Sequence, residues 1–134
     1  MFFLRNIFKP KTRKIERRKS ERVSAEGEVK IDFQTMTSRR ISGIGTGNDI
    51  SISGMRFATF APLKKGQMLE AALYFGKKFP GLKKIPLQMT VVRVYKPFGS
   101  RRYRIGVSFI ESPRYKQEFE VLKQLVFWLR TQTG

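Results

Sequence analysis

The chain has 134 residues, enough for one compact domain, and its 40% of hydrophobic residues, including 12 Phe, can build a core. Its 28 Lys and Arg residues outnumber 10 Asp and Glu, and the net charge of +18 favours an anionic partner: a nucleotide, a nucleic acid, an anionic membrane or an acidic protein. Because the sequence contains no Cys and no His, disulfides, thiolate zinc sites and most catalytic triads are excluded, so a binding protein is favoured over an enzyme.

Residues 1–22 differ from the rest of the chain and are interpreted as a flexible basic N-terminal arm with nine Lys and Arg residues. Apolar side chains between Phe3 and Phe8 share one side of a short helix, which Pro10 ends. Such a segment predicts peripheral contact with an anionic membrane through residues 2–8, and a frayed terminus is the alternative. The apolar run Met1–Leu4 is far shorter than the roughly 20 residues of a membrane span, so a cytoplasmic protein is expected.

Residues 23–134 are interpreted as the folded domain, because the apolar residues now alternate with polar ones as in half-buried strands. The glycine-rich stretch 43–48 lacks the Lys-Ser/Thr pair of a phosphate-binding loop, and we interpret it as a turn or a bulge. A change of phase at Val91 and Val92 predicts another bulge, and Pro97–Ser100 predicts a hairpin turn. Six strands are expected: one around residues 29–33, one that starts near Arg40 and Ile41 with the glycine-rich stretch in or beside it, and four around 52–60, 69–75, 87–94 and 103–109.

A helical period replaces the alternation near the end of the chain. Ser112 is a candidate N-cap, and Pro113 stands where the first helical residue belongs. Phe119, Leu122 and the apolar residues that follow them share one face of this helix. Six short strands and one helix predict a mainly β protein, namely a six-stranded antiparallel β-barrel whose C-terminal helix closes one end.

Two short motifs stand at the ends of this pattern. Arg18 and Arg22 form an RxxxR pair in the arm, with Arg17 immediately before it, and residues 49–54 form a DxSxxG motif with Asp49 first. The two motifs in this order, together with the closing strand 103–109 and the helix, make the chain resemble the PilZ family. The resemblance covers most of the chain and implies a six-stranded barrel with a C-terminal helix. It also implies a protein that binds cyclic di-GMP and is not an enzyme.

The chemistry of the motif residues fits that ligand. An Arg fork from Arg18 or Arg22 can grip the O6 and N7 edge of a guanine or a phosphate, while Asp49 can accept from the guanine N1–H and N2–H₂ groups. Ser51 can donate its hydroxyl to a phosphate, and Gly54 leaves room for the ligand or for a positive φ. Each of these residues also has an ordinary explanation: solvated arm charges, an Asx turn, a strand hydroxyl and a bulge glycine.

The resemblance implies a sensor or adaptor whose arm orders on binding cyclic di-GMP and so acts on an unidentified effector protein. Motility, exopolysaccharide production, adhesion or virulence is the regulated process in such proteins. Because Arg17 is a third guanidinium beside the RxxxR pair, two ligand molecules per domain are expected, and no other cofactor or metal.

Two alternative functions stay open at the level of sequence. One is a basic β-barrel that binds nucleic acid, for which Tyr103 and Arg104 give a weak hint and which is the less favoured partner. The other is a PilZ-fold adaptor that has lost nucleotide binding, against which the intact motifs argue.

Overall fold

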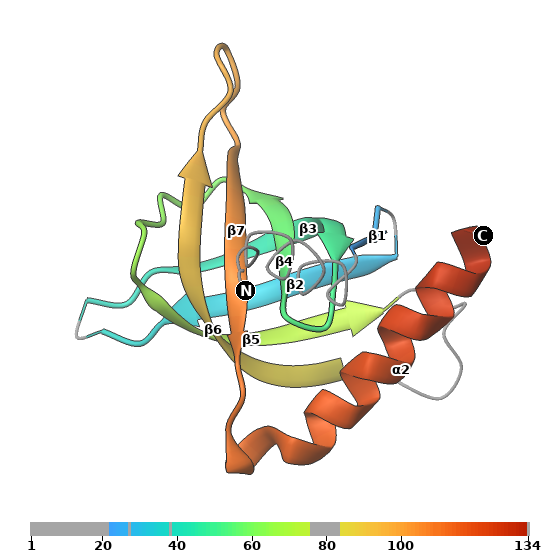
Figure 1. The fold of residues 1–134 in the computed structure, drawn as a ribbon. Helices are drawn as coiled ribbons and strands as arrows, with labels where there is room; N and C mark the ends of the chain where they lie inside the picture. The colour runs from blue at the N-terminus through green and yellow to red at the C-terminus, as the bar shows by residue number, and fades with distance from the viewer. Residues whose placement is uncertain (1–21, 27, 38, 76–83, 134) are drawn as a thin grey trace, which may run out of the picture.

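The computed structural model describes residues 22–26, 28–37, 39–75 and 84–133. None of the helices within these residues is long and apolar enough to cross a membrane. The described chain forms the six expected strands, one additional short strand and the C-terminal helix (Figure 1). The elements are β1 (Val23–Ser24), β2 (Val29–Thr35), β3 (Ser42–Ile50), β4 (Gly54–Thr59), β5 (Met68–Phe75), β6 (Lys84–Tyr95), β7 (Tyr103–Ile110), the 3₁₀ helix η1 (Pro113–Tyr115) and α2 (Lys116–Thr133).

Six of the strands close into an antiparallel barrel. The order around the sheet is β3-β2-β5-β6-β7-β4, and the pairing of β3 with β4 closes the ring. The pairing of β2 with β3 covers Ser42 to Thr46, so the later half of β3 is left unpaired by β2 along this edge. Strand β1 uses this edge, with Val23 opposite Ile50. Two residues are too few to give a recognisable alternation, which is why the sequence did not predict this strand.

The glycine-rich stretch belongs to β3, so interpreting residues 43–48 as a turn was wrong, although a bulge does interrupt the pairing with β4 between Gly47 and Asp49. The glycines stand at positions where the barrel interior is crowded. A Cβ atom on Gly43 would lie only 2.8 Å from Cζ of Phe33. The ring of Phe33 packs against that of Phe57, with the centroids 5.6 Å apart. The missing side chains therefore make room for large rings inside a narrow barrel.

The hairpin of β6 and β7 has the two irregularities that the sequence predicted. The register shifts between Val91 and Arg93, which confirms the bulge. At the tip, the backbone N–H of Ser100 donates to the carbonyl of Pro97 at 3.0 Å, and Gly99 takes a positive φ of 79°. This turn projects well beyond the body of the barrel (Figure 1).

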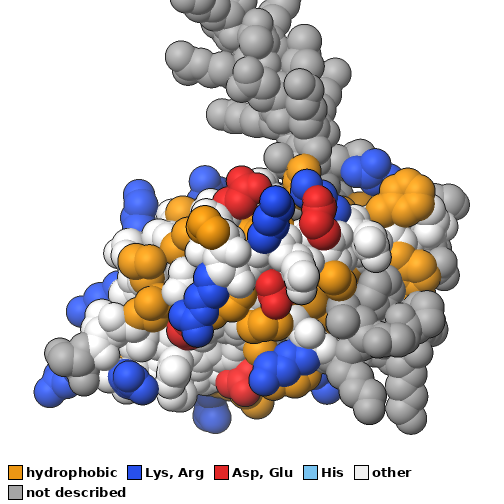
Figure 2. All heavy atoms as spheres, turned by 90° about the horizontal axis from the view of Figure 1, so that it is seen from below, with side chains coloured by type: hydrophobic (Ala, Val, Ile, Leu, Met, Phe, Trp, Pro, Cys, Tyr) orange, Lys and Arg blue, Asp and Glu red, His pale blue; other side chains and the backbone are white. Residues whose placement is uncertain are grey.

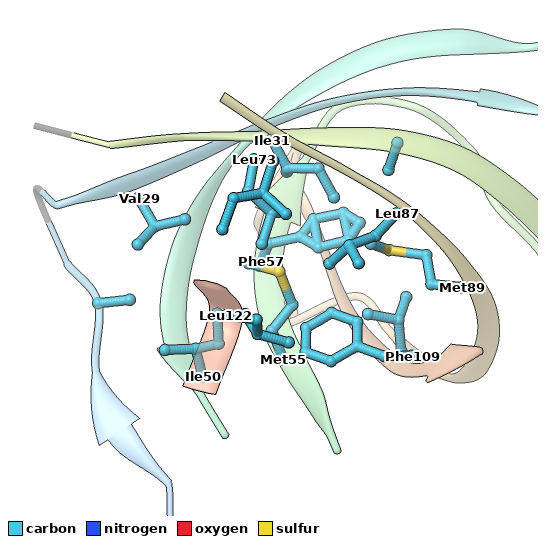
Figure 3. Packing of buried hydrophobic residues seen from close by; sticks show 14 of the residues in the cluster. Val29, Ile31, Ile50, Met55, Phe57, Leu73, Leu87, Met89, Phe109 and Leu122 are labelled. Atoms are coloured by element: carbon cyan, nitrogen blue, oxygen red, sulfur yellow. The ribbon is translucent and has the colours of Figure 1, made fainter. Parts of the chain in front are cut away.

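Helix α2 closes one end of the barrel and completes the core (Figure 1). Ser112 is the N-cap, and its side chain accepts from the N–H of Arg114, although the first turn is a 3₁₀ turn that leads into α2. Leu122 is fully buried and lies beside Ile50 and Met55 (Figure 3). The largest fully buried side chains come from all six barrel strands and from the helix: Phe57, Ile31, Ile50, Met55, Leu69, Leu73, Ile85, Leu87, Met89, Ile105, Leu122 and Leu125.

On at least one face of the molecule, the basic side chains do not form a single patch (Figure 2). Figure 2 shows the face seen from below the view of Figure 1, where Lys and Arg side chains are interspersed with acidic and hydrophobic ones. A net charge of +18 therefore does not by itself locate a binding site, and the geometry of individual side chains has to do so.

Candidate functional site

Five backbone positions form one row across the outer face of the barrel. Strand pairing places Ser24 of β1 opposite Asp49 of β3, and Asp49 opposite Arg56 of β4. Arg56 in turn lies opposite Gly106 of β7, and Gly106 lies opposite Arg93 of β6. Since neighbouring strands lie about 4.8 Å apart, the backbones of Arg56 and Arg93 are separated by about 10 Å, with a glycine between them. The row is therefore a shallow floor with a guanidinium on each side.

Asp49 is the most firmly held side chain of this row. Its Oδ2 accepts from Nε of Arg56 at 2.7 Å, and Nη2 of Arg56 contacts the same oxygen. This hydrogen bond, opposed by partial burial and helped by the charge of Asp49, raises the pKa of Arg56 above its ordinary value. Nη1 of Arg22 lies 3.7 Å from Oδ1, an atom that is buried and accepts no hydrogen bond from the residues that the structure describes. One oxygen is therefore engaged, while the other keeps its capacity to accept.

A pocket of about 680 Å³ opens over the floor beside Asp49. This volume lies within the range of sites for small organic ligands. Arg93 and Arg104 line the pocket, and within the described part of the chain neither has a carboxylate at ion-pair distance. The pocket is thus lined by three guanidinium groups and two carboxylates, those of Glu26 and Asp49, and in the described part of the chain Arg56 is the one of the three guanidiniums that is ion-paired. The polar and aromatic side chains that line it are Glu26, Asn48, Asp49, Arg56, Arg93, Tyr95 and Arg104.

Ser51 lies in the turn from β3 to β4 and Gly54 is the first residue of β4, and neither of them lines the pocket. The Ser51 hydroxyl is buried and accepts from the backbone N–H groups of Ser53 and Gly54, both at 3.2 Å. Gly54 has no positive φ, so that part of its interpretation was wrong. A Cβ atom there would lie 2.1 Å from the carbonyl oxygen of Val107, so β7 occupies the space that we expected a ligand to use. A direct ligand contact of either residue stays a prediction.

A family model of the PilZ domain matches residues 16–128, which is most of the chain. The chain belongs to the PilZ family. The match includes both motifs on which the resemblance was based, although Arg17 and Arg18 lie outside the described residues. A search of the curated proteins finds no match.

Solved PilZ structures have the same fold. The PilZ domain with c-di-GMP of YcgR from Escherichia coli matches with a TM-score of 0.64 and 18% identity, covering 87% of this chain and 94% of that one. The structure of K. pneumonia MrkH matches with a TM-score of 0.65 and 16% identity, covering 84% of this chain and 49% of MrkH. The Bacillus subtilis inhibitor of motility MotI/DgrA matches with a TM-score of 0.56, 15% identity and coverages of 84% and 54%. The chain therefore spans about half the length of the two latter proteins.

The sequence analysis named neither Arg56 nor Arg93, and it named Arg104 only as a hint of nucleic-acid binding. It expected Arg22 beside Asp49 in the ligand-bound state, and in the structure Nη1 of Arg22 lies 3.7 Å from Oδ1 of Asp49. Arg56 stands two residues after the DxSxxG motif of this PilZ chain, and its role depends on its being directly opposite Asp49 across two strands. Arg93 and Arg104 depend on the register of the β6–β7 hairpin. Strand alternation after the motif could have indicated that Arg56 points outward like Asp49. No sequence signal fixed the position of the other two.

Proposed function

We propose that this PilZ protein binds cyclic di-GMP in the pocket beside Asp49 and acts as a sensor or adaptor rather than as an enzyme. One observation carries the proposal: a carboxylate oriented by Arg56 adjoins a pocket in which Arg93 and Arg104 have no anionic partner among the described residues. Relatives support it, since YcgR and MrkH are solved as complexes with c-di-GMP.

The ligand matches these groups by chemistry. Cyclic di-GMP is doubly anionic, and two phosphodiesters match the two arginines that lack a counter-charge. The carboxylate of Asp49 can accept from the N1–H and N2–H₂ groups of one guanine. The planar guanidinium groups and the ring of Tyr95 offer faces on which a purine can stack. A neutral or cationic ligand would leave the two arginines uncompensated inside a partly enclosed cavity.

The arm supplies the regulatory step in this proposal. Nη1 of Arg22 lies 3.7 Å from Oδ1 of Asp49, so the described chain reaches the site at the residue where the arm ends. Bound ligand draws Arg17 and Arg18 onto the barrel, which orders residues 1–22 and changes the surface offered to an effector protein. The name of one relative refers to inhibition of motility. Motility, exopolysaccharide production, adhesion and virulence remain the candidate processes. No finding supports membrane contact through residues 2–8, which lie outside the described residues.

Two ligand molecules per domain are the expected stoichiometry. A stacked pair of cyclic di-GMP molecules brings four negative charges together, which is costly unless several cations surround them. Arg17 adds a third guanidinium to the RxxxR pair of the arm. Replacing it in Arg17→Leu should reduce the calorimetric stoichiometry from two towards one while specific binding persists. A stoichiometry near one for the unchanged protein contradicts this point without affecting the binding site itself.

Calorimetric titration tests the proposed function directly. We expect a dissociation constant in the micromolar range or below, equivalent to about −8 kcal/mol or better. Arg18→Ala and Arg22→Ala should each weaken binding by about 1.5–3 kcal/mol, the value of a hydrogen bond to a charged group. Lys64→Ala is the matched control, because it removes an exposed positive charge that does not line the pocket. Absence of binding heat with folded protein, or equal losses in all three variants, would refute the proposal.

Nucleic-acid binding is the second candidate, and one observation favours it. Tyr95 lies directly opposite Arg104 and two residues after Arg93, so an aromatic side chain alternates with arginines at the rim of the pocket. Tyr103, which gave the original hint, packs instead against the core. Titration with a single-stranded oligonucleotide at two salt concentrations separates the candidates. Affinity for nucleic acid should fall steeply with salt, whereas a specific nucleotide should remain bound and should be preferred over GTP and cyclic di-AMP.

A further inference from the structure

A second groove, of about 470 Å³, lies on the outer face of the barrel across β2, β3 and β4. Its apolar walls are Ile44, which is 75% exposed, Phe60, which is 67% exposed, and Tyr74. Its floor includes Ala58, whose side chain is a single methyl group, and the backbone of Gly45, whose missing side chain would point into the barrel. Large exposed apolar side chains gathered around a concave floor mark an interaction site more often than they occur by chance on a monomer.

Arg102 stands at one side of this groove and is held in a fixed orientation. Its Nη2 donates to Oγ1 of Thr46 at 2.6 Å and to the carbonyl of Ala58 at 3.5 Å. The guanidinium carbon lies 5.6 Å from the centroid of the Phe60 ring, a cation–π distance. Its Nε is buried and has no hydrogen-bond acceptor in the part of the chain that the structure describes. Neutral groups therefore orient the guanidinium, and no carboxylate among the described residues forms an ion pair with it.

The charge balance of the groove is positive. Lys30 and Arg102 line it against a single carboxylate, that of Asp32, and none of the described carboxylates forms an ion pair with either cation. The whole chain adds a field of +18 in the same direction. An occupant that brings carboxylates beside apolar side chains would satisfy both the charge and the exposed hydrophobic walls.

We propose that this groove is the docking site for a segment of a partner protein in which acidic residues stand next to apolar ones. A second copy of this chain is disfavoured, because a two-fold interface through the groove would bring Arg102 and Lys30 against their own equivalents. The basic arm of residues 1–22 would likewise add positive charge to positive charge. A flat lipid surface cannot fill a groove whose floor lies below Ile44 and Phe60, whereas a single peptide segment can.

The groove adjoins the nucleotide pocket, which links the two sites in space. On β4, Arg56 and Ala58 point outward, and Phe60 follows the end of the strand at Thr59. Arg56 and Ala58, which lines the groove, are separated by about 7 Å along the strand at 3.4 Å per residue. A small cavity that includes Arg102 and Arg104 lies between the two sites. Docking in the groove does not require nucleotide binding, so a failure of one proposal would leave the other standing.

A random peptide library displayed on phage tests the proposal with the full-length protein as bait, with and without cyclic di-GMP. Peptides retained by the unchanged protein should be enriched in Asp and Glu adjacent to Leu, Ile, Phe or Tyr. Synthetic versions should lose at least about tenfold in affinity on Phe60→Ser and on Ile44→Ser, the loss expected at a contact near the centre of an interface. Arg102→Gln should reduce the preference for acidic peptides over their Asn and Gln counterparts.

Phe98→Ser is the matched control, because Phe98 is fully exposed at the tip of the β6–β7 turn, between basic residues and away from the groove. Its affinity for the peptides should be unchanged, and thermal unfolding should show all variants folded, since the altered walls are exposed. The proposal is overturned if no enriched peptide depends on Phe60, or if the enriched peptides lack acidic residues. It is also overturned if the Phe60-dependent partner proves to be anionic vesicles or a second copy of the chain, as seen by flotation or by sedimentation.

Discussion

The two sides of strands β3 and β4 differ in what holds their residues in place. Inward-pointing Ile50, Met55 and Phe57 are fully buried in the barrel. Outward-pointing Asp49 and Arg56 are held by an ion pair in which two guanidinium nitrogens contact Oδ2 of Asp49, and their side chains are 14% and 54% exposed. A buried side chain of this size contributes about 2–5 kcal/mol when truncated, and an exposed ion pair about 0–1 kcal/mol. We therefore expect stability and the proposed ligand recognition to depend on alternate residues of the same strands, and substitutions should separate them.

The largest effect should come from the interior, where α2 meets the barrel. Leu122 is fully buried beside Ile50 and Met55, so Leu122→Ala should lower the free energy of unfolding by about 2–5 kcal/mol. The affinity for cyclic di-GMP, measured well below the new melting temperature, should stay the same. Phe127→Ala on the exposed side of the same helix is the control and should change stability little. A large loss of affinity in Leu122→Ala would show that the helix shapes the pocket and would remove the separation.

The converse effect is expected on the outer face. Asp49→Asn keeps the shape of the side chain but removes the negative charge that we propose accepts from guanine, so affinity for cyclic di-GMP should fall by about 1.5–3 kcal/mol. Stability should change by no more than about 1 kcal/mol, because Arg56 is half exposed and can be solvated. The control is Asp32→Asn, the other Asp of the chain, which is exposed on β2 and does not line this pocket. Equal affinity of both variants in calorimetry would exclude Asp49 from the ligand site.

The same alternation decides what the sequence could predict. The period of two located the six barrel strands, and the period near 3.6 located α2, because burial on one side determines both patterns. The bulge at Val91 was predictable since it breaks the alternation within one strand. Strand β1 was not predictable, because Val23 and Ser24 are too few residues to carry a period, and its pairing depends on where β2 leaves β3.

The candidate site was predictable only where its residues belong to one local motif. Asp49 was found that way, and its contact with Arg22 agrees with the motif pair. Arg56, Arg93 and Arg104 come together through strand register, which depends on the closure of the whole barrel. Ser51 illustrates the opposite case, since its hydroxyl is consumed by the turn that the motif builds. A motif therefore indicates a position in the fold more reliably than the direction of each side chain.

A smaller effect on both stability and ligand affinity is expected where the turn from β3 ends and β4 begins. Gly54→Ala places a Cβ atom 2.1 Å from the Val107 carbonyl oxygen, so β4 and β7 must move apart at a cost of about 1–3 kcal/mol in stability. The shift also displaces Asp49 at the other end of the turn and should weaken cyclic di-GMP binding. Ile52→Ala in the same turn is the control, because that side chain is exposed. A Gly54→Ala protein with unchanged melting and affinity would mean that the turn relaxes freely and that the two sides are not coupled there.

The smallest effect concerns a polar contact that stabilises the fold from outside the core. The Tyr115 hydroxyl of η1 donates to Oε1 of Glu70 on β5 at 2.8 Å, and this hydrogen bond is the main cause that raises the pKa of Tyr115. Tyr115→Phe should therefore cost about 1 kcal/mol near neutral pH. Because the pKa is raised in the folded state, this contribution is fully present below the unfolded value of about 10 and is lost as the pH rises through the folded value.

The difference in unfolding midpoint between the two proteins should be constant from pH 7 to 9 and should shrink at higher pH. Tyr74→Phe, an exposed tyrosine on the same strand as Glu70, should show no such trend. A Tyr115→Phe difference that stays constant up to pH 11.5 would show that the hydroxyl does not tie η1 to the barrel, and that all the stability of this end comes from the apolar face of α2.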